Sequence, residues 1–264
     1  MNDWLRYPRI LAICWRAGVS GEMEYRLNFL SSAALSGFWM LWAVAGVAVY
    51  FQFTGDIAGW GYGEVLVVVG LFFAVNGIRQ MLFDPNLQRM GEYVRRGTLD
   101  FLLTKPVDAQ LLVSLRHLNV QNLTDPVLGL ILVVAGVLVT GRGVSAAGLA
   151  SFVLLLAAAV TLLYAMTVVL LAVAVRVMAA EELGEVSFTV TELARFPVQL
   201  YRQPVQTVLT VVPVAFLTTV PAQALLERLD PWMLLVGPAV AAGALVVATL
   251  TWRRSLRSYT GASA

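Results

Sequence analysis

The sequence predicts an all-α integral membrane protein with six membrane-crossing helices. Of its 264 residues, 59% are hydrophobic and only 13% are charged, whereas a soluble domain carries about 25% charged residues. Several apolar stretches reach the roughly 20 residues that a helix needs to cross the hydrocarbon of a bilayer. Such a chain must place its surplus nonpolar surface against lipid. The formal net charge of +2 gives no reason to expect a nucleic-acid partner.

Residues 1–28 precede the first span and predict an amphipathic helix on the cytoplasmic membrane surface. Trp4, Leu11 and Trp15 supply apolar surface, while Arg9 and Arg16 can reach lipid headgroups. Because charged residues interrupt the apolar run, we do not expect a secretory signal here.

Five stretches have the length and composition of membrane spans. They are Phe29–Tyr50, Tyr62–Phe83, Leu123–Thr140, Ala146–Val175 and Met233–Thr251.

The region between the fourth and last of these stretches leaves two alternatives for the fifth span. Hydropathy alone favours Val205–Val220. Alternatively, Glu182–Leu200 crosses the membrane, and residues Pro204–Leu226 form a re-entrant segment on the outer side, broken by prolines. Irregular backbone at that depth is tolerated only where protein or water covers it. Both alternatives give six crossings.

The distribution of basic residues predicts the orientation. Cytoplasmic segments of membrane proteins carry an excess of Lys and Arg. With both termini in the cytoplasm, all of the 18 basic residues except Arg142 and Arg228 can lie on the cytoplasmic side. The re-entrant alternative also moves Arg195 and Arg202 outward, and the excess keeps its sign.

The stretch Asp84–His117 is the only sizeable polar segment between the predicted spans. Its Leu99, Leu102 and Leu103 have helical spacing and predict an exposed apolar stripe on a short helix, which Pro106 ends. This stripe could dock into a groove on another protein. It could equally lie on lipid headgroups, and the residues alone do not decide between the two.

The run RRGTLDFLLTKPVD, at Arg95–Asp108, resembles the cytoplasmic loop of ABC-2-type transporter permeases. Other similarities follow in order along the chain, and together they resemble one bacterial branch of these permeases, once grouped as a domain of unknown function. They are EYRLNF at Glu24–Phe29, ELARFP at Glu192–Pro197, PVAF at Pro213–Phe216 and PAQALL at Pro221–Leu226.

The resemblance implies that residues 1–264 form a single ABC-2-type membrane domain in the bacterial cytoplasmic membrane. It implies the interfacial helix 1–28, a cytoplasmic coupling loop at 84–117, and a re-entrant segment at 204–226. It therefore favours Glu182–Leu200 as the fifth span. The implied partners are a second permease copy or a paralogue, and a separate ATPase subunit that binds ATP and Mg.

Two sets of candidate functional residues follow. The resemblance implies that the ATPase contacts Glu92, Arg95, Arg96, Gly97, Leu99, Asp100, Phe101, Leu102, Lys105 and Pro106. Ionisable residues within spans are functional candidates because burying charge is costly. The candidates for a translocation path are Asn76, Arg79, Glu192 and Arg195, which form two pairs at i, i+3. A structural role is the alternative for each pair.

The chain lacks the residues for several kinds of chemistry. It has no phosphate-binding P-loop, its only lysine is Lys105, and its only histidine is His117. We therefore expect no catalytic residues, metal or cofactor in this chain. The resemblance implies a transport subunit of an ATP-driven exporter of a small or amphiphilic substrate. The alternatives are a membrane enzyme acting on lipids or isoprenoids, and a scaffold that transports nothing. The sequence does not indicate the substrate.

Overall fold

The computed structural model describes residues 6–22, 26–177, 180–211 and 213–258. Within them, five helices are long and apolar enough to cross a membrane, and each matches one of the five stretches expected from the sequence. They are α2 (Arg26–Phe51), the continuous helix from α3 (Tyr62–Ile78) through η2 (Arg79–Phe83) to α4 (Asp84–Arg95), α7 (Thr124–Thr140), α8 (Ala146–Val177) and α12 (Met233–Arg257).

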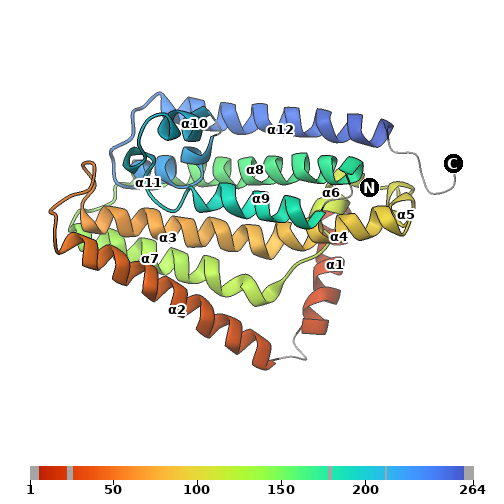
Figure 1. The fold of residues 1–264 in the computed structure, drawn as a ribbon, viewed down its shortest axis with the longest axis horizontal. Helices are drawn as coiled ribbons and strands as arrows, with labels where there is room; N and C mark the ends of the chain where they lie inside the picture. The colour runs from red at the N-terminus through yellow and green to blue at the C-terminus, as the bar shows by residue number, and fades with distance from the viewer. Residues whose placement is uncertain (1–5, 23–25, 178–179, 212, 259–264) are drawn as a thin grey trace.

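The long helices run lengthwise through the bundle, the short helix α9 (Ala180–Glu192) lies between α8 and α3, and most other short elements lie at the two ends (Figure 1). At one end lie α4, α5 (Leu99–Leu103), α6 (Ala109–Leu115) and the end of α12. The predicted amphipathic helix is α1 (Arg6–Glu22), which crosses the direction of the bundle near this end. Its Trp15 indole donates a hydrogen bond of 2.7 Å to the Leu115 carbonyl.

The region of the expected fifth span contains only short helices. These are α9 (Ala180–Glu192), η4 (Val198–Leu200), α10 (Val205–Val211), η5 (Val214–Phe216) and α11 (Thr219–Leu225). The hydropathy-based alternative of one helix through Val205–Val220 is therefore wrong. Pro213 cannot donate a helical hydrogen bond. After η5, the Thr218 hydroxyl donates a hydrogen bond of 2.6 Å to the Ala194 carbonyl. With 13 residues, α9 is also shorter than a span, so the sixth crossing stays a prediction.

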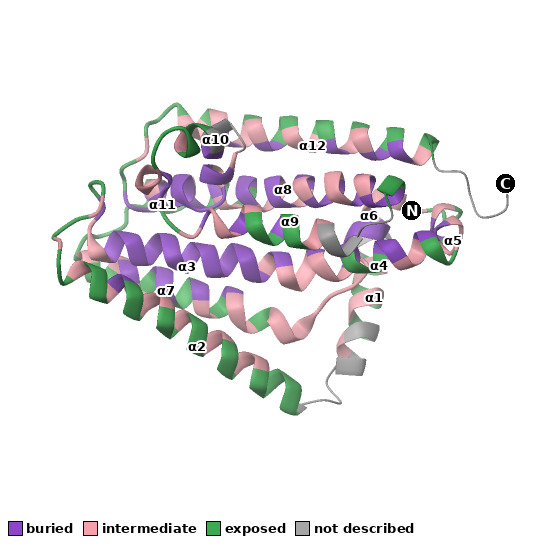
Figure 2. Cartoon of the chain, viewed as in Figure 1, coloured by how far each residue is buried: buried purple, intermediate pink, exposed green. Residues whose placement is uncertain are grey.

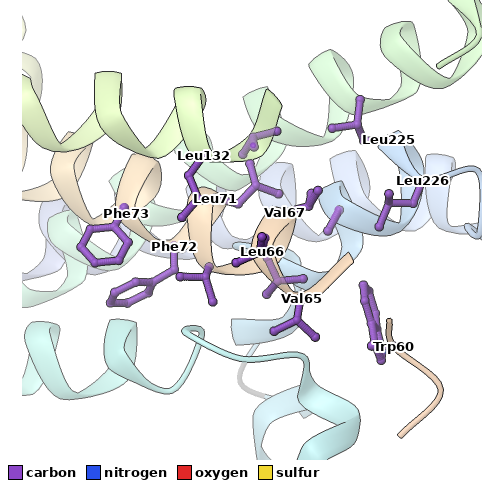
Figure 3. Packing of buried hydrophobic residues seen from close by; sticks show 14 of the residues in the cluster. Trp60, Val65, Leu66, Val67, Leu71, Phe72, Phe73, Leu132, Leu225 and Leu226 are labelled. Atoms are coloured by element: carbon purple, nitrogen blue, oxygen red, sulfur yellow. The ribbon is translucent and has the colours of Figure 1, made fainter. Parts of the chain in front are cut away.

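Helix α3 lies at the centre of the bundle. Every residue from Gly63 to Gly77 is buried, in contrast to the largely exposed α2 (Figure 2). Around the start of α3, the side chains of Trp60, Leu66 and Phe72 belong to a core cluster that also includes Leu132 of α7 and Leu225 of α11 (Figure 3). Helix α3 thus makes its apolar contacts within the chain, whereas the exposed surface of α2 can contact lipid or a partner.

Glycines spaced seven residues apart bring α3 and α7 into backbone contact. A Cβ added at Gly70 would lie 2.7 Å from the Gly129 carbonyl oxygen, and one at Gly136 would lie 2.8 Å from the Gly63 carbonyl oxygen. Small residues allow such close approach between membrane helices, where packing rather than the hydrophobic effect drives association.

Helix α8 packs along α12 through small residues on one face. The Ser255 hydroxyl of α12 donates a hydrogen bond to the Ala172 carbonyl of α8. Ala159 and Ala165 of α8 are also buried, while Ala157 is exposed. Most of the alanine-rich surface of α8 therefore serves packing within the chain.

One buried carboxylate ties together three loops at the end of the bundle opposite α4. Glu64 forms ion pairs with Arg142, at 3.0 Å, and with Arg228. It also accepts a hydrogen bond from the Gly61 backbone at 2.9 Å, and Arg228 donates to the Gly59 carbonyl. Arg142 and Arg228 are the two arginines that both topology alternatives place outside.

We expect replacement of Gly70 by alanine to destabilise the bundle by about 1–3 kcal/mol, because the new methyl group would force α3 and α7 apart. The matched control is Gly37→Ala on α2, where an added Cβ has no neighbour within 4 Å. The measurement is the free energy of unfolding of both variants in one detergent. Equal stabilities would contradict the close approach.

Candidate functional site

The segment after the second span contains the predicted short helix and proline break. Helix α4 ends at Arg95, and Gly97 has a φ of +65°, a conformation that glycine adopts without steric cost. Helix α5 follows, and Pro106 separates it from α6. Asp108 caps α6 by accepting a hydrogen bond of 3.0 Å from the Leu111 backbone. The result is a compact, helical loop.

The prediction of an exposed apolar stripe on α5 is wrong for two of its three leucines, Leu99 and Leu102. Leu99 and Leu102 are 0% and 4% exposed. They pack in a cluster with Leu87 and Met90 of α4 and with Trp252 of α12. A five-residue helix has little surface, and its apolar face is covered by its own chain. These leucines therefore hold the loop in place and are not available to a partner.

The exposed apolar group of this loop is Phe101, whose side chain is 72% exposed. Charged residues of both signs lie near it along the chain. Arg95, Arg96, Lys105 and Pro106 are exposed, while Glu92, Gly97 and Asp100 are partly buried. Arg96 pairs with Glu92 at 2.7 Å across one turn of helix, and pairs of this kind at a surface add little stability. The loop surface thus combines one exposed aromatic ring with charged groups of both signs.

His117 anchors the far end of this loop to α4. The Asn86 side chain donates a hydrogen bond to the His117 carbonyl and accepts one from its backbone N–H, both at 2.9 Å. The Tyr93 hydroxyl and His117 Nε2 share a hydrogen bond of 2.7 Å. Burial, aided by the nearby charges of Arg89 and Arg116, lowers the pKa of His117 to about 4. The role of this histidine is structural packing.

Arg79 is buried at 2% exposure, and each of its three side-chain nitrogens donates at least one hydrogen bond. Its Nε and one terminal nitrogen donate to the Asn76 side-chain oxygen at 3.2 and 3.0 Å. Its other terminal nitrogen donates to both carboxylate oxygens of Asp84, at 2.8 and 2.6 Å. Arg79 therefore does not reach to the surface as a lone charge, because Asp84 neutralises it.

The second predicted pair also forms. Arg195 donates to Glu192 at 2.8 Å, in the turn that follows α9. The two pairs meet through reciprocal contacts with aromatic rings: the Arg79 guanidinium lies 5.8 Å from the ring centre of Phe188 in α9, and that of Arg195 lies 4.9 Å from the ring centre of Phe72 in α3. The four sequence-derived candidates thus gather where α3 faces α9.

A groove of about 610 Å³ opens beside Arg79. Residues of the helix that contains Arg79 form one side, and α9 forms the other. Its lining residues are Arg79, Gln80, Asp84, Leu87, Gln88, Gly184, Glu185 and Phe188. The groove combines amide, carboxylate and aromatic groups, so it suits a ligand with both polar and apolar parts. No group of three metal-ligating side chains lies together in the described part of the chain.

Sequence reasoning missed Asp84 and Phe188. In an α-helix, a residue five positions on lies about 140° around the axis, so Asp84 would not face Arg79. The π-helical turn η2 brings them together, and Pro85 was the only local sign of an irregular helix. Phe188 lies in a helix with many polar residues, where one aromatic side chain gives no distinct pattern.

We expect the single histidine to remain neutral down to about pH 4 in the folded chain. Because the pKa is lowered from 6.5, the unfolded chain binds the proton first, and stability falls as the pH drops from 6.5 toward 4. The measurement is an NMR titration of isotope-labelled histidine, with a purification tag that contains none. A midpoint near 6.5 would contradict the packing of His117, and Tyr93→Phe should move the midpoint.

No curated protein and no solved structure shows significant similarity to the chain. Residues 38–263, however, match the family described as ABC-2 family transporter protein. This match covers most of the chain, including the bundle, the loop with Phe101 and the groove beside Arg79. The chain is therefore a multi-pass membrane protein that belongs to the ABC-2 transporter family and is a permease of that family.

Proposed function

We propose that this permease is the membrane-spanning subunit of an ATP-driven exporter, and that it couples through the α4–α6 loop to a separate ATPase subunit. The ATPase binds ATP and Mg, and its closure pushes on the loop. A second permease copy or a paralogue completes the pathway, through which a small or amphiphilic substrate leaves the cytoplasm. Family membership supports the transport role.

The observation that carries this proposal is the exposed Phe101 at the end of a helical projection. The continuous helix from Tyr62 to Arg95 has 34 residues and is about 51 Å long, well beyond the roughly 30 Å of hydrocarbon. Helix α4 therefore extends past the bilayer. A single exposed aromatic residue among charged groups of both signs, on a loop anchored by buried leucines, suits insertion into a groove of a partner protein.

We assign six crossings, with α9 and the turn to Leu200 as the fifth and Pro204–Leu226 as the re-entrant segment on the outer side. Two observations support this topology. Residues of α11 pack beside Trp60 at the end that holds Glu64, opposite the loop with Phe101. Helix α1 and the end of α12 lie at the loop end, as expected if both termini are in the cytoplasm of a bacterial cell.

We assign the groove beside Arg79 to the translocation path. Of the four candidates, Arg79 lines the groove and binds Asn76, while Glu192 and Arg195 pair with each other in the turn after α9. This pairing, together with Asp84, leaves little uncompensated charge in the membrane. Movement of α9 relative to the second span would then open the groove to one side of the membrane or the other.

Phe101→Asp should abolish co-purification of an ATPase from native membranes, because the charge would prevent insertion of the ring into an apolar groove. The matched control is Phe53→Asp, an equally exposed phenylalanine, at 85%, in the loop at the other end of the bundle. The measurement is ATPase activity and subunit content of the eluate in mild detergent.

Retention of the ATPase by Phe101→Asp would overturn the assigned contact. Absence of an ATPase from both the unaltered protein and the Phe53→Asp control would overturn the exporter itself. Leu99 and Leu102 are unsuitable for this test, since their burial means that a charge there would unfold the loop.

A cysteine in place of Phe188 should react with a water-soluble maleimide in a Cys14→Ser background, because the groove admits water. Trapping the ATPase with vanadate should change the labelling rate by at least about threefold, as the path rearranges. The control is Val246→Cys on the exposed face of α12, which should not react in either state. Equal rates at position 188 in both states would exclude the groove from the path.

A further inference from the structure

The second span and the projecting helix α4 are joined by a single π-helical turn. In η2 (Arg79–Phe83) the backbone N–H of Asp84 donates to the Arg79 carbonyl, five residues earlier. Such turns are rare inside α-helices, and they occur frequently at functional sites. This turn separates α3, which is buried in the bundle, from α4, which bears the exposed loop.

The π turn and the ion pair between Arg79 and Asp84 depend on each other. An i→i+5 hydrogen bond places residue 84 one turn above residue 79, on the same side of the helix. In a continuous α-helix the two residues would lie about 140° apart around the axis. The contact of one guanidinium nitrogen with both Asp84 oxygens, at 2.8 and 2.6 Å, therefore requires this turn and stabilises it.

Two carbonyl groups of the turn accept hydrogen bonds from residues outside the helix. Pro85 has no N–H to donate, and the Met81 carbonyl instead accepts a hydrogen bond of 2.9 Å from the Asn119 backbone. The Gln80 carbonyl accepts one of 3.3 Å from the Asn122 side chain. Both asparagines belong to the connector before α7. Hydrogen bonds from this connector thus hold the irregular turn, in place of a continuous series of helical hydrogen bonds.

The position of the turn connects the two sites described above. From Tyr62, about 20 residues cross the hydrocarbon, so the turn lies where the helix leaves the bilayer. Arg79 and Asp84 line the groove beside α9, and α4 continues from Asp84 to the loop with Phe101. A change in this turn would alter the groove and the direction of α4 together.

We infer that the π-helical turn Arg79–Phe83 is the hinge that converts movement of the α4–α6 loop into rearrangement of the groove, and that the Arg79–Asp84 ion pair holds it in one position. This inference rests on the proposed function for the origin of the movement. Opening of the ion pair releases the turn from its present geometry and changes the direction of α4 relative to α3. Asp84 is therefore a positioning residue that acts through α4.

The test measures distances between spin labels in the full chain, reconstituted alone in lipid nanodiscs with Cys14→Ser. One label replaces Arg95 at the end of α4, and the other replaces the exposed Leu130 of α7. Asp84→Asn should broaden the distance distribution about twofold, because α4 is no longer fixed in direction. Asp84→Glu retains the charge and should restore a width close to that of the unaltered chain.

Two controls distinguish a hinge from general loosening. Glu92→Gln breaks an ion pair of similar length on the same helix but away from the turn, and it should leave the width unchanged. A second label pair, at Leu130 and Val246, lies within the bundle and should not respond to Asp84→Asn. Should Asp84→Asn fail to fold, Asn122→Ala, which removes only the hydrogen bond to the Gln80 carbonyl, should broaden the 95–130 distribution.

An unchanged 95–130 width in the folded variant would overturn the hinge, as would equal broadening of both label pairs. Because the chain is measured without an ATPase, this result is independent of the co-purification experiment. A hinge without an associated ATPase would contradict the proposed function alone.

Discussion

The direct backbone contact between α3 and α7 is the constraint on which the rest of the structure depends. Lipid tails are as apolar as leucine side chains, so a membrane bundle is held by close packing rather than by exclusion of water. The glycines of α3 and α7 allow this packing over several turns. With α3 fixed at the centre, α8, α9 and α11 can pack against its remaining faces. The polar groups near its end then have fixed positions.

The polar groups in the second span show how a membrane helix can contain charge without being destabilised. An isolated arginine at that depth is costly, but Arg79 has Asn76 and Asp84 as hydrogen-bond partners and a phenylalanine ring nearby. Arg195 has Glu192 and another ring. Each charge is compensated locally. The chain can therefore keep ionisable groups beside the groove, where their rearrangement costs less than exposure to lipid.

The sequence predicted the five long helices because length and hydropathy are local properties, and the structure confirms them. It also predicted the short helix and proline break after the second span. It failed where the outcome depends on tertiary contacts. Leu99 and Leu102 have the pattern of a docking stripe, yet their partners are Leu87 and Trp252, distant in sequence. Asp84 could not be paired with Arg79 without knowledge of the π turn, and the prolines of residues 204–221 divide a stretch that hydropathy treats as continuous.

The Glu64 junction has a consequence for how this chain can change in evolution. One carboxylate side chain serves Arg142, Arg228 and the first turn of its own helix. Loss of Glu64 alone would leave the positive charges of Arg142 and Arg228 close together without the carboxylate that both contact. Loss of Arg142 would release one loop from the junction but leave the pair between Glu64 and Arg228. Position 142 can thus vary with less loss of structure than position 64, on which both arginines depend.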